Sequence, residues 1–327
     1  MRTNGFRKYL QKRGQASKDL SSSIESVKHF EEYLKMKKST LESATVDLLK
    51  TYILHLIKKH ENSEDRFTAI ARYFYYIKKN DLYVYLVSIL GSASVQHEIG
   101  KRLVRIAGEE IYHRVYQEIK FPPLGSPQDD FPSVTKKIIE RMEAELPLAT
   151  CREVMTWNYH QVPTAAFKDC KRRFEKSKSV DEYLKEEHKR LVVELESCMK
   201  NGRLWFEQEI TPEVLEFVKN KQEINTGVRR GNRIFKIKIP YAPKQFLKEK
   251  NPIMRRYYSC HCQLVRTTLR KDNPNISPTF CYCSAGYEKV HFDVIFEQNV
   301  EVEVLETLLK GDSRCRFAIK IPKDKMK

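Results

Sequence analysis

Two closely spaced pairs of cysteines, Cys260-His261-Cys262 and Cys281-Tyr282-Cys283, are the residues of this chain best suited to chemistry. A cysteine thiolate is a ligand for zinc and other soft metals, and it is also a nucleophile. If both segments are β-strands, the side chains at i and i+2 share a face, so each pair directs two sulfurs to one side. Two such strands lying side by side would gather four thiols. The sequence therefore predicts a thiol site in its C-terminal region.

Three interpretations of this site are open on the sequence alone. Zinc binds four ligands in a tetrahedron, although the Cys-x-Cys spacing is less typical of zinc sites than Cys-x-x-Cys, whose turn helps to wrap the metal. The same thiols could instead be reactive groups or line a binding pocket, or they could be small residues of the core. The candidate metal ligands are Cys260, His261, Cys262, Cys281, Cys283 and Cys315.

Cys151 and His160 are candidate additional ligands. A cysteine and a histidine on adjoining helices could complete a site that is built mainly by C-terminal strands. The alternatives are a buried, structural Cys151 and a His160 whose hydrogen bonds are satisfied by its neighbours, since free cysteine is among the most buried residue types.

The sequence lacks the motifs of several large enzyme classes. It has no Gly-rich phosphate loop, no dinucleotide fingerprint, no His-Glu-x-x-His and no Gly-x-Ser-x-Gly. We therefore expect a binding or sensor-type protein in which cysteines hold a metal, with zinc as the expected cofactor, beside a small-molecule pocket. A metal- or thiol-dependent hydrolase of a small organic substrate is the enzymatic alternative, and both remain open.

The composition describes a folded, basic chain of 327 residues. Hydrophobic residues make up 41% and charged residues 31%, a balance typical of a globular protein long enough for two hydrophobic cores. No segment has the pattern of a secretory signal or a membrane span, so we expect a cytoplasmic protein with reduced thiols and no membrane partner. The net charge of +17 suits an anionic partner such as DNA, although a generally basic protein would show the same value.

Helical periodicity dominates the first 120 residues. Apolar residues recur at the spacing of one buried helix face in residues 17–34, 45–60, 67–80, 83–90 and 95–119. Ser17 is placed to cap the first of these helices. Residues 121–133 then hold four prolines and a glycine, which excludes helix over most of that segment. The prediction is an all-α helical bundle over residues 1–120, followed by a Pro-rich linker over residues 121–133.

Residues 134–327 are predicted to form a mixed α+β domain with an antiparallel sheet. Helical patterns cover residues 134–146, 180–199 and 212–218, the last with Thr211 as cap. Alternating residues predict a strand at 234–239, with Lys236 and Lys238 on a polar face that is either solvated or forms a groove for a phosphate or carboxylate. Further strands are expected at 256–265, 279–283, 289–297 and 314–321, with a short helix at 301–310.

The N-terminal helices resemble a known DNA-binding domain, the helical core-binding domain of tyrosine recombinases. The segments that carry the resemblance are Phe6-Arg7-Lys8-Tyr9-Leu10, Lys28-His29-Phe30-Glu31-Glu32-Tyr33-Leu34 and Ala71-Arg72-Tyr73-Phe74-Tyr75-Tyr76-Ile77-Lys78. It implies a SAM-like domain that clamps DNA through phosphate contacts, here from Arg7, Lys8, Lys12 and Arg13. The chain has no His-x-x-Arg motif of the recombinase catalytic domain, so strand exchange is not expected. A helical bundle with solvated basic residues is the alternative.

The C-terminal region resembles the ending of 4-vinyl reductase-type and aminothiazoline-carboxylate hydrolase-like domains. The matching segments are Phe280-Cys281-Tyr282-Cys283-Ser284-Ala285-Gly286-Tyr287 and Lys310-Gly311-Asp312-Ser313-Arg314-Cys315-Arg316-Phe317. The resemblance implies an α+β domain that binds a small organic molecule, in some relatives with a cysteine-ligated metal. Those relatives commonly have a further cysteine where this chain has Thr307, and Cys260 with Cys262 would replace it. Together with Glu209-Ile210-Thr211-Pro212 and Lys238-Ile239-Pro240-Tyr241, these segments are also similar to an uncharacterised bacterial family of Cys-rich proteins, which implies a fold but no activity.

Overall fold

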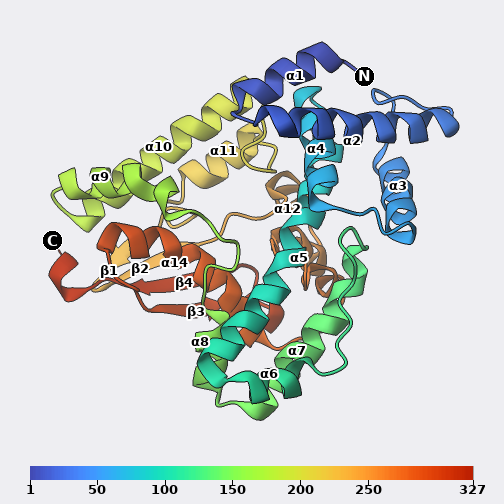
Figure 1. Ribbon diagram of the computed structural model, residues 1–327. Helices are drawn as coiled ribbons and strands as arrows, with labels where there is room; N and C mark the ends of the chain where they lie inside the picture. Colours follow the sequence, from blue (N-terminus) through green and yellow to red (C-terminus); the bar gives the residue numbers. More distant parts are fainter. Residues whose placement is uncertain (327) are drawn as a thin grey trace. The chain divides into compact units, whose positions relative to one another are not determined.

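The computed structural model describes residues 1–326, apart from the side chains of residues 17, 18, 92 and 93. It shows an α+β protein, as predicted, with an all-helical N-terminal region and one antiparallel sheet formed by C-terminal residues (Figure 1). The chain divides into two compact units. The first comprises Met1–Ala93 and Phe121–Asp130, and the second comprises Ser94–Lys120 and Phe131–Lys327. Among the described residues, no helix is both long and apolar enough to cross a membrane.

The first unit is a bundle of helices around an aromatic core. Its helices are α1 (Thr3–Lys12), α2 (Ser17–Met36), α3 (Val46–Lys58), α4 (Glu64–Tyr76) and the first half of α5 (Asn80–Ala107). Phe30, Tyr52 and Phe74 meet in the buried centre, with the Phe30 and Tyr52 rings 4.7 Å apart. Residues Phe121–Asp130 of the Pro-rich segment belong to this unit. Their Gly125, with a φ of +94°, lies against the buried Phe67.

The cap predicted at Ser17 is wrong, because Ala16 is the residue before α2 and Ser17 is the first residue of the helix. Thr45 caps α3, since its hydroxyl accepts a hydrogen bond from the Leu48 N–H at 3.3 Å. Replacing Thr45 with alanine leaves that N–H without its cap and is expected to lower the unfolding free energy by about 1 kcal/mol. Thr51→Ala is the matched control, because Thr51 is exposed inside the same helix and alanine is the better helix former there. Urea denaturation followed by far-ultraviolet circular dichroism measures both, and equal losses for the two variants would contradict the capping role.

One predicted boundary in the helical region is wrong. Residues 83–90 and 95–119 were expected to form two helices, but α5 runs without interruption from Asn80 to Ala107. The glycine and serines between the two patterns lower helix propensity by only about 1 kcal/mol per glycine, which does not end a well-packed helix. The break comes instead at Gly108, whose φ of +88° is unfavourable for other residues, and α6 (Glu109–Tyr116) follows.

The second unit combines helices with a four-stranded sheet. Its strands are β1 (Val228–Arg230), β2 (Arg233–Ile237), β3 (Val302–Glu306) and β4 (Arg316–Lys320), in the spatial order β1-β2-β4-β3. All three pairings are antiparallel. After α6, its helices are α7 (Phe131–Glu145), α8 (Leu148–Met155), α9 (Lys168–Lys176), α10 (Val180–Lys200), α11 (Pro212–Lys219), α12 (Pro243–Lys248), α13 (Pro252–Ser259) and α14 (Tyr282–Phe296).

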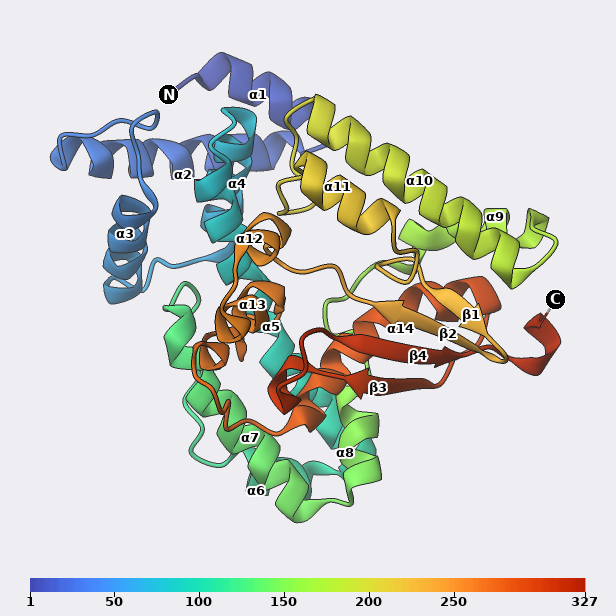
Figure 2. The ribbon, with the colours of Figure 1, turned by 180° about the vertical axis from the view of Figure 1, so that it is seen from behind.

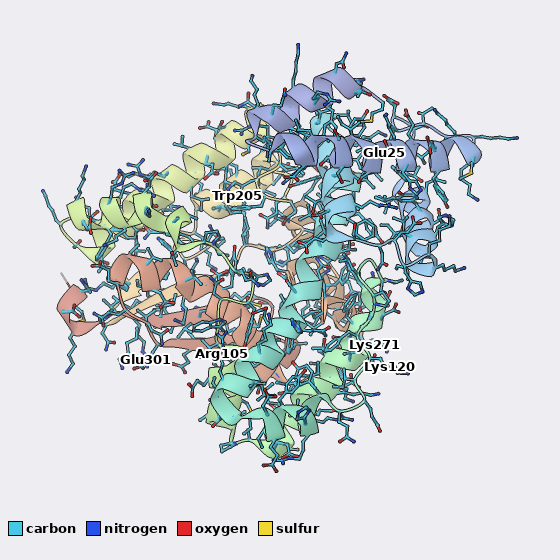
Figure 3. The ribbon with its side chains drawn as sticks, in the orientation of Figure 1. Glu25, Arg105, Lys120, Trp205, Lys271 and Glu301 are labelled. Carbon is cyan, nitrogen blue, oxygen red and sulfur yellow. The ribbon has the colours of Figure 1, made fainter. Side chains whose placement is uncertain are left out.

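Helix α14 lies along one face of this sheet, as both ribbon views show (Figures 1 and 2). Side chains of β2 and β4 on that face, Ile234 and Ile319, pack with Phe292 of α14. Ile237 points to the opposite face and joins the apolar residues of α10 and α11. At the rim of the sheet, Lys320 forms an exposed ion pair of 2.8 Å with Glu301, which is labelled in Figure 3.

Three of the predicted strands, and the short helix, are wrong. Residues 256–265 contain the end of α13 and a loop, residues 279–283 contain a 3₁₀ turn and the start of α14, and residues 289–297 lie mostly in α14. Helix α14 is buried on most of its circumference, so its apolar residues show no period of 3.6, and its β-branched and aromatic content suggested strands. The predicted helix at 301–310 is β3 followed by a 3₁₀ turn, whereas the strands predicted at 234–239 and 314–321 are confirmed.

Candidate functional site

The end of the β2–β4 pairing brings Lys238 next to Cys315. Ile237 pairs with Arg316 at the last position of the ladder, and the Lys238 N–H then donates to the Cys315 carbonyl at 3.0 Å. Directly opposed residues of an antiparallel pair point to the same face. Lys238 and Cys315 therefore lie on the face of the sheet that α14 covers.

A tight turn between β3 and β4 connects Cys315 to Cys281. Gly311 has a φ of +91°, a conformation that suits glycine, and the Asp312 carboxylate accepts a hydrogen bond from the Thr307 N–H at 2.7 Å. The Thr307 hydroxyl, which is fully buried, donates to the Cys281 sulfur at 2.7 Å. The Gly-Asp-x-x-Cys ending thus shapes the turn that carries Thr307 and Cys315 to the thiols.

The segment after α13 supplies two more cysteines and His261. Cys260 ends the helix, with its N–H still bonded to the Arg256 carbonyl at 3.2 Å. The Cys260 sulfur lies 3.9 Å from the Cys262 carbonyl oxygen, which also accepts the Arg266 N–H at 2.9 Å. His261 donates from Nε2 to the Ile239 carbonyl at 2.7 Å, because a carbonyl oxygen can only accept, and its Nδ1 keeps a lone pair.

Neither Cys-x-Cys pair lies on a strand, so the predicted geometry of the thiol site is wrong. Cys260 and Cys262 belong to a helix end and the loop after it. Cys281 ends the 3₁₀ turn Pro278–Cys281, and Cys283 is in the first turn of α14. Residues i and i+2 of a helix do not share a face, so Cys281 and Cys283 are not directed to the same side in the way that a strand would direct them.

Five cysteines nevertheless gather in one place, and we call Cys260, Cys262, Cys281, Cys283 and Cys315 the thiol cluster. Cys260 and Cys283 are buried in a single apolar core of the second unit, and the other three are half-buried against the same core. Burial and, to a smaller extent, the neighbouring Cys262 thiol raise the pKa of Cys260 to about 12. Burial first and another cysteine second also raise the pKa of Cys262, Cys281 and Cys315.

The thiol cluster is a set of soft donors that does not form a coordination sphere as it stands. Within residues 1–326, no three His, Cys, Asp or Glu side chains have the mutual spacing needed to hold a metal ion. With pKa values raised this far, the thiols are protonated at neutral pH. The five cysteines therefore lie close together because the segments that carry them pack against one another.

Cys151 and His160 contact groups other than the cluster thiols. Cys151 is buried in the same apolar core, but its sulfur lies 3.4 Å and 3.6 Å from the carbonyl oxygens of Met142 and Leu146. His160 is exposed and its ring meets that of Tyr287 edge-on, with centroids 5.4 Å apart. These contacts favour a structural role for Cys151 and place His160 beside Tyr287.

A buried ionic group adjoins the thiol cluster. The Glu288 carboxylate of α14 accepts from Lys236 at 2.7 Å and lies 3.5 Å from the Lys238 ammonium. Lys238 also donates to the Ser284 hydroxyl at 3.1 Å. Lys236 is buried, so the expectation that this lysine face is solvated is wrong. Sequence reasoning missed Ser284, Glu288 and Thr307 as site residues. The available signal was Glu288, a carboxylate within the largely apolar segment that forms α14.

The four basic residues proposed to contact DNA lie on α1 or directly after it. Arg7, Lys8, Lys12 and Arg13 are all exposed. The Arg13 guanidinium packs over the rings of Tyr9 and Tyr75, at 5.0 Å and 5.2 Å from their centroids. Their exposure is compatible with phosphate contacts and equally with solvation, so DNA binding stays a prediction.

Comparison with known proteins gives one match, over residues 238–327, to a family of unknown function, DUF6144. No curated protein and no solved structure matches the chain. The matched residues begin at Lys238 and include the whole thiol cluster together with Ser284 and Glu288. The part of this chain that is similar to that family is therefore the part that carries the candidate site.

Proposed function

We propose that this is a binding or sensor-type protein whose second unit holds zinc through the thiol cluster, beside a site for a small molecule. The observation that carries the proposal is the meeting of five cysteines from three separate segments, around residues 260–262, 281–283 and 315. The other three of the eight cysteines do not join the cluster. Cys170 and Cys198 belong to other apolar cores, and the Cys151 thiol bonds to a backbone carbonyl.

The donor chemistry of the cluster fits a soft metal. Zinc takes four ligands and accepts thiolate sulfur and imidazole nitrogen, and the five thiols with the His261 lone pair exceed that number. The present spacing does not fit a coordination sphere, so zinc binding requires the cysteine side chains to rearrange. When bound, zinc would stabilise the thiolate forms and hold the three segments to one another.

The residues around the cluster serve this role in distinct ways. Thr307 holds the Cys281 sulfur by its hydroxyl, and the β2–β4 pairing fixes Cys315 beside Lys238. The Lys238 ammonium lowers the pKa of Cys283, although burial outweighs it and leaves that pKa at about 12. A positive charge at this position favours thiolate formation when metal displaces the protons.

The thiol-dependent hydrolase is the less favoured alternative. A nucleophilic cysteine needs a low pKa, yet a thiol with a pKa of about 12 is ionised in only about one molecule in 10⁵ at neutral pH. His261 cannot act as the activating base through Nε2, because that nitrogen donates to the Ile239 carbonyl. The thiols are therefore better placed as ligands than as nucleophiles.

Elemental analysis combined with thiol titration tests the zinc proposal. We expect about one zinc per chain, with the cluster thiols protected until the protein is unfolded. Cys281→Ser and Cys315→Ser should each lose most of the zinc. Cys198→Ser is the matched control, because Cys198 is buried in a different apolar core, and it should retain the metal.

Circular dichroism establishes whether each variant is folded. If Cys281→Ser fails to fold, acid titration of the wild type replaces it, because protons compete with zinc for thiolates and the metal should leave as the pH falls. Protein that carries no zinc and binds none when zinc is added would overturn the proposal, as would full zinc content in folded Cys281→Ser and Cys315→Ser.

A further inference from the structure

The buried ionic group of the second unit is unbalanced. Lys236 and Lys238 share the single carboxylate of Glu288, and all three side chains are largely shielded, with exposures of 9%, 15% and 4%. Glu288 is closer to Lys236, at 2.7 Å, than to Lys238, at 3.5 Å. One positive charge therefore remains without a full partner, and buried charges are stable only when they are paired.

The Lys238 ammonium points toward groups that could hold an organic ligand. It donates to the Ser284 hydroxyl at 3.1 Å and lies 4.9 Å from the centre of the Tyr287 ring. The Tyr287 ring in turn meets His160 edge-on at 5.4 Å. Two ring faces, one hydroxyl and one ammonium thus lie within one small region next to Cys283 and Cys315.

Solvent reaches this region. His160 is exposed and Tyr287 is 37% exposed. The Lys238 side chain is itself 15% exposed, so a small ligand can approach its ammonium group past the two rings.

We propose that Lys238 and Ser284 form the anchoring subsite for a small organic monoanion, such as a carboxylate, whose body lies against Tyr287 and His160. The ligand's negative charge completes the pairing of two lysines that share the single Glu288 carboxylate, and the Ser284 hydroxyl donates to a second ligand oxygen. A single excess charge selects a monoanion over a dianion. This subsite deepens the proposed small-molecule function, but it does not depend on zinc, because no cysteine thiol contributes to the anchor.

Thermal unfolding of the full chain with benzoate, and with its neutral counterpart benzamide, tests the subsite. Benzoate should raise the melting temperature of the wild type by a few degrees, whereas benzamide should not. Lys238→Met should abolish the benzoate effect and should itself raise the melting temperature without ligand, because it removes the excess buried charge. Lys320→Met is the control: Lys320 pairs with Glu301 at the rim of the sheet, so the anchor stays intact and the benzoate response should be kept. Lys236→Met leaves Glu288 to Lys238 alone and should weaken the response.

Two results would overturn the subsite. One is the lack of any benzoate effect on the wild type, and the other is an equal effect on the wild type and Lys238→Met. Zinc content keeps the two proposals separate, because it is judged on Cys281→Ser and Cys315→Ser, in which Lys238 and Ser284 are intact.

Discussion

Glu288→Gln is expected to lower the unfolding free energy of the second unit by about 3–5 kcal/mol, the usual cost of removing one partner from a buried ion pair. The substitution keeps the shape of the side chain and removes its charge. Two buried ammonium groups, those of Lys236 and Lys238, would then repel each other with no carboxylate between them. Denaturant unfolding followed by tryptophan fluorescence measures the loss, because both tryptophans of the chain, Trp157 and Trp205, belong to this unit.

The pH dependence of this effect has a definite sign. Burial by itself raises the pKa of Glu288, but Lys236 and Lys238 together lower it from 4.5 to about 2, with His261 a smaller influence in the same direction. A carboxyl group with a lowered pKa stabilises the fold above its unfolded pKa and loses this contribution as the pH falls through the folded pKa. The difference between wild type and Glu288→Gln should therefore be full at neutral pH and shrink between about pH 4.5 and pH 2.

Two comparisons make this prediction specific. Glu301→Gln removes a carboxylate from the exposed pair with Lys320 and should cost no more than about 0.5 kcal/mol. In a Lys238→Met background the Glu288→Gln penalty should become smaller, since only one ammonium remains. A penalty for Glu288→Gln no larger than that for Glu301→Gln would show that the buried group is not an interacting pair.

Gly286→Ala should destabilise the second unit by about 3 kcal/mol or more, as overpacking against rigid backbone does. A methyl group at Gly286 of α14 would lie 2.9 Å from the Trp157 carbonyl carbon and still closer to the Trp157 backbone nitrogen and oxygen. Main-chain atoms cannot rotate away as a side chain can, so the helix and the segment after α8 must separate. That segment also carries His160, so the change should disturb its contact with Tyr287.

The control for this substitution is another glycine inside a helix. Gly91 of α5 is exposed, and a methyl group there would meet nothing within 4 Å. Gly91→Ala should leave stability unchanged or raise it by up to about 1 kcal/mol, because alanine restricts the unfolded chain and favours helix. Circular dichroism during denaturation compares the two variants, and similar stabilities for both would rule out a steric role for the α14 contact.

Local signals predicted those parts of the fold in which each residue's neighbours in sequence determine its structure. The cap at Thr211 and the helix that begins after Ser179 depend on contacts within one turn. The alternation around Phe235 likewise identified β2. In α14, by contrast, packing on almost every side replaces the amphipathic pattern, and local propensity pointed to strands.

The arrangement of the candidate site could not be predicted from the sequence. Cys260, Cys262, Cys281 and Cys283 lie in or against one apolar core, but helices, a turn and a loop carry them in place of the predicted strands. The role of Glu288 could not be predicted, because a carboxylate acquires two lysine partners only when α14 packs on the sheet. Contacts between residues far apart in the sequence leave no repeating pattern along the chain from which they could be predicted.

The hydrogen bond between Lys238 and Cys315 can form only after the other cysteines of the cluster have been synthesised. Cys260, Cys262, Cys281 and Cys283 leave the ribosome before β4, whose pairing with β2 places Cys315 beside them. At typical translation rates, about 3–12 s separate the synthesis of Cys260 from that of Lys320. During this interval the nascent chain exposes four thiols that the finished fold encloses, so its vulnerability to oxidants is greatest before the last strand is in place.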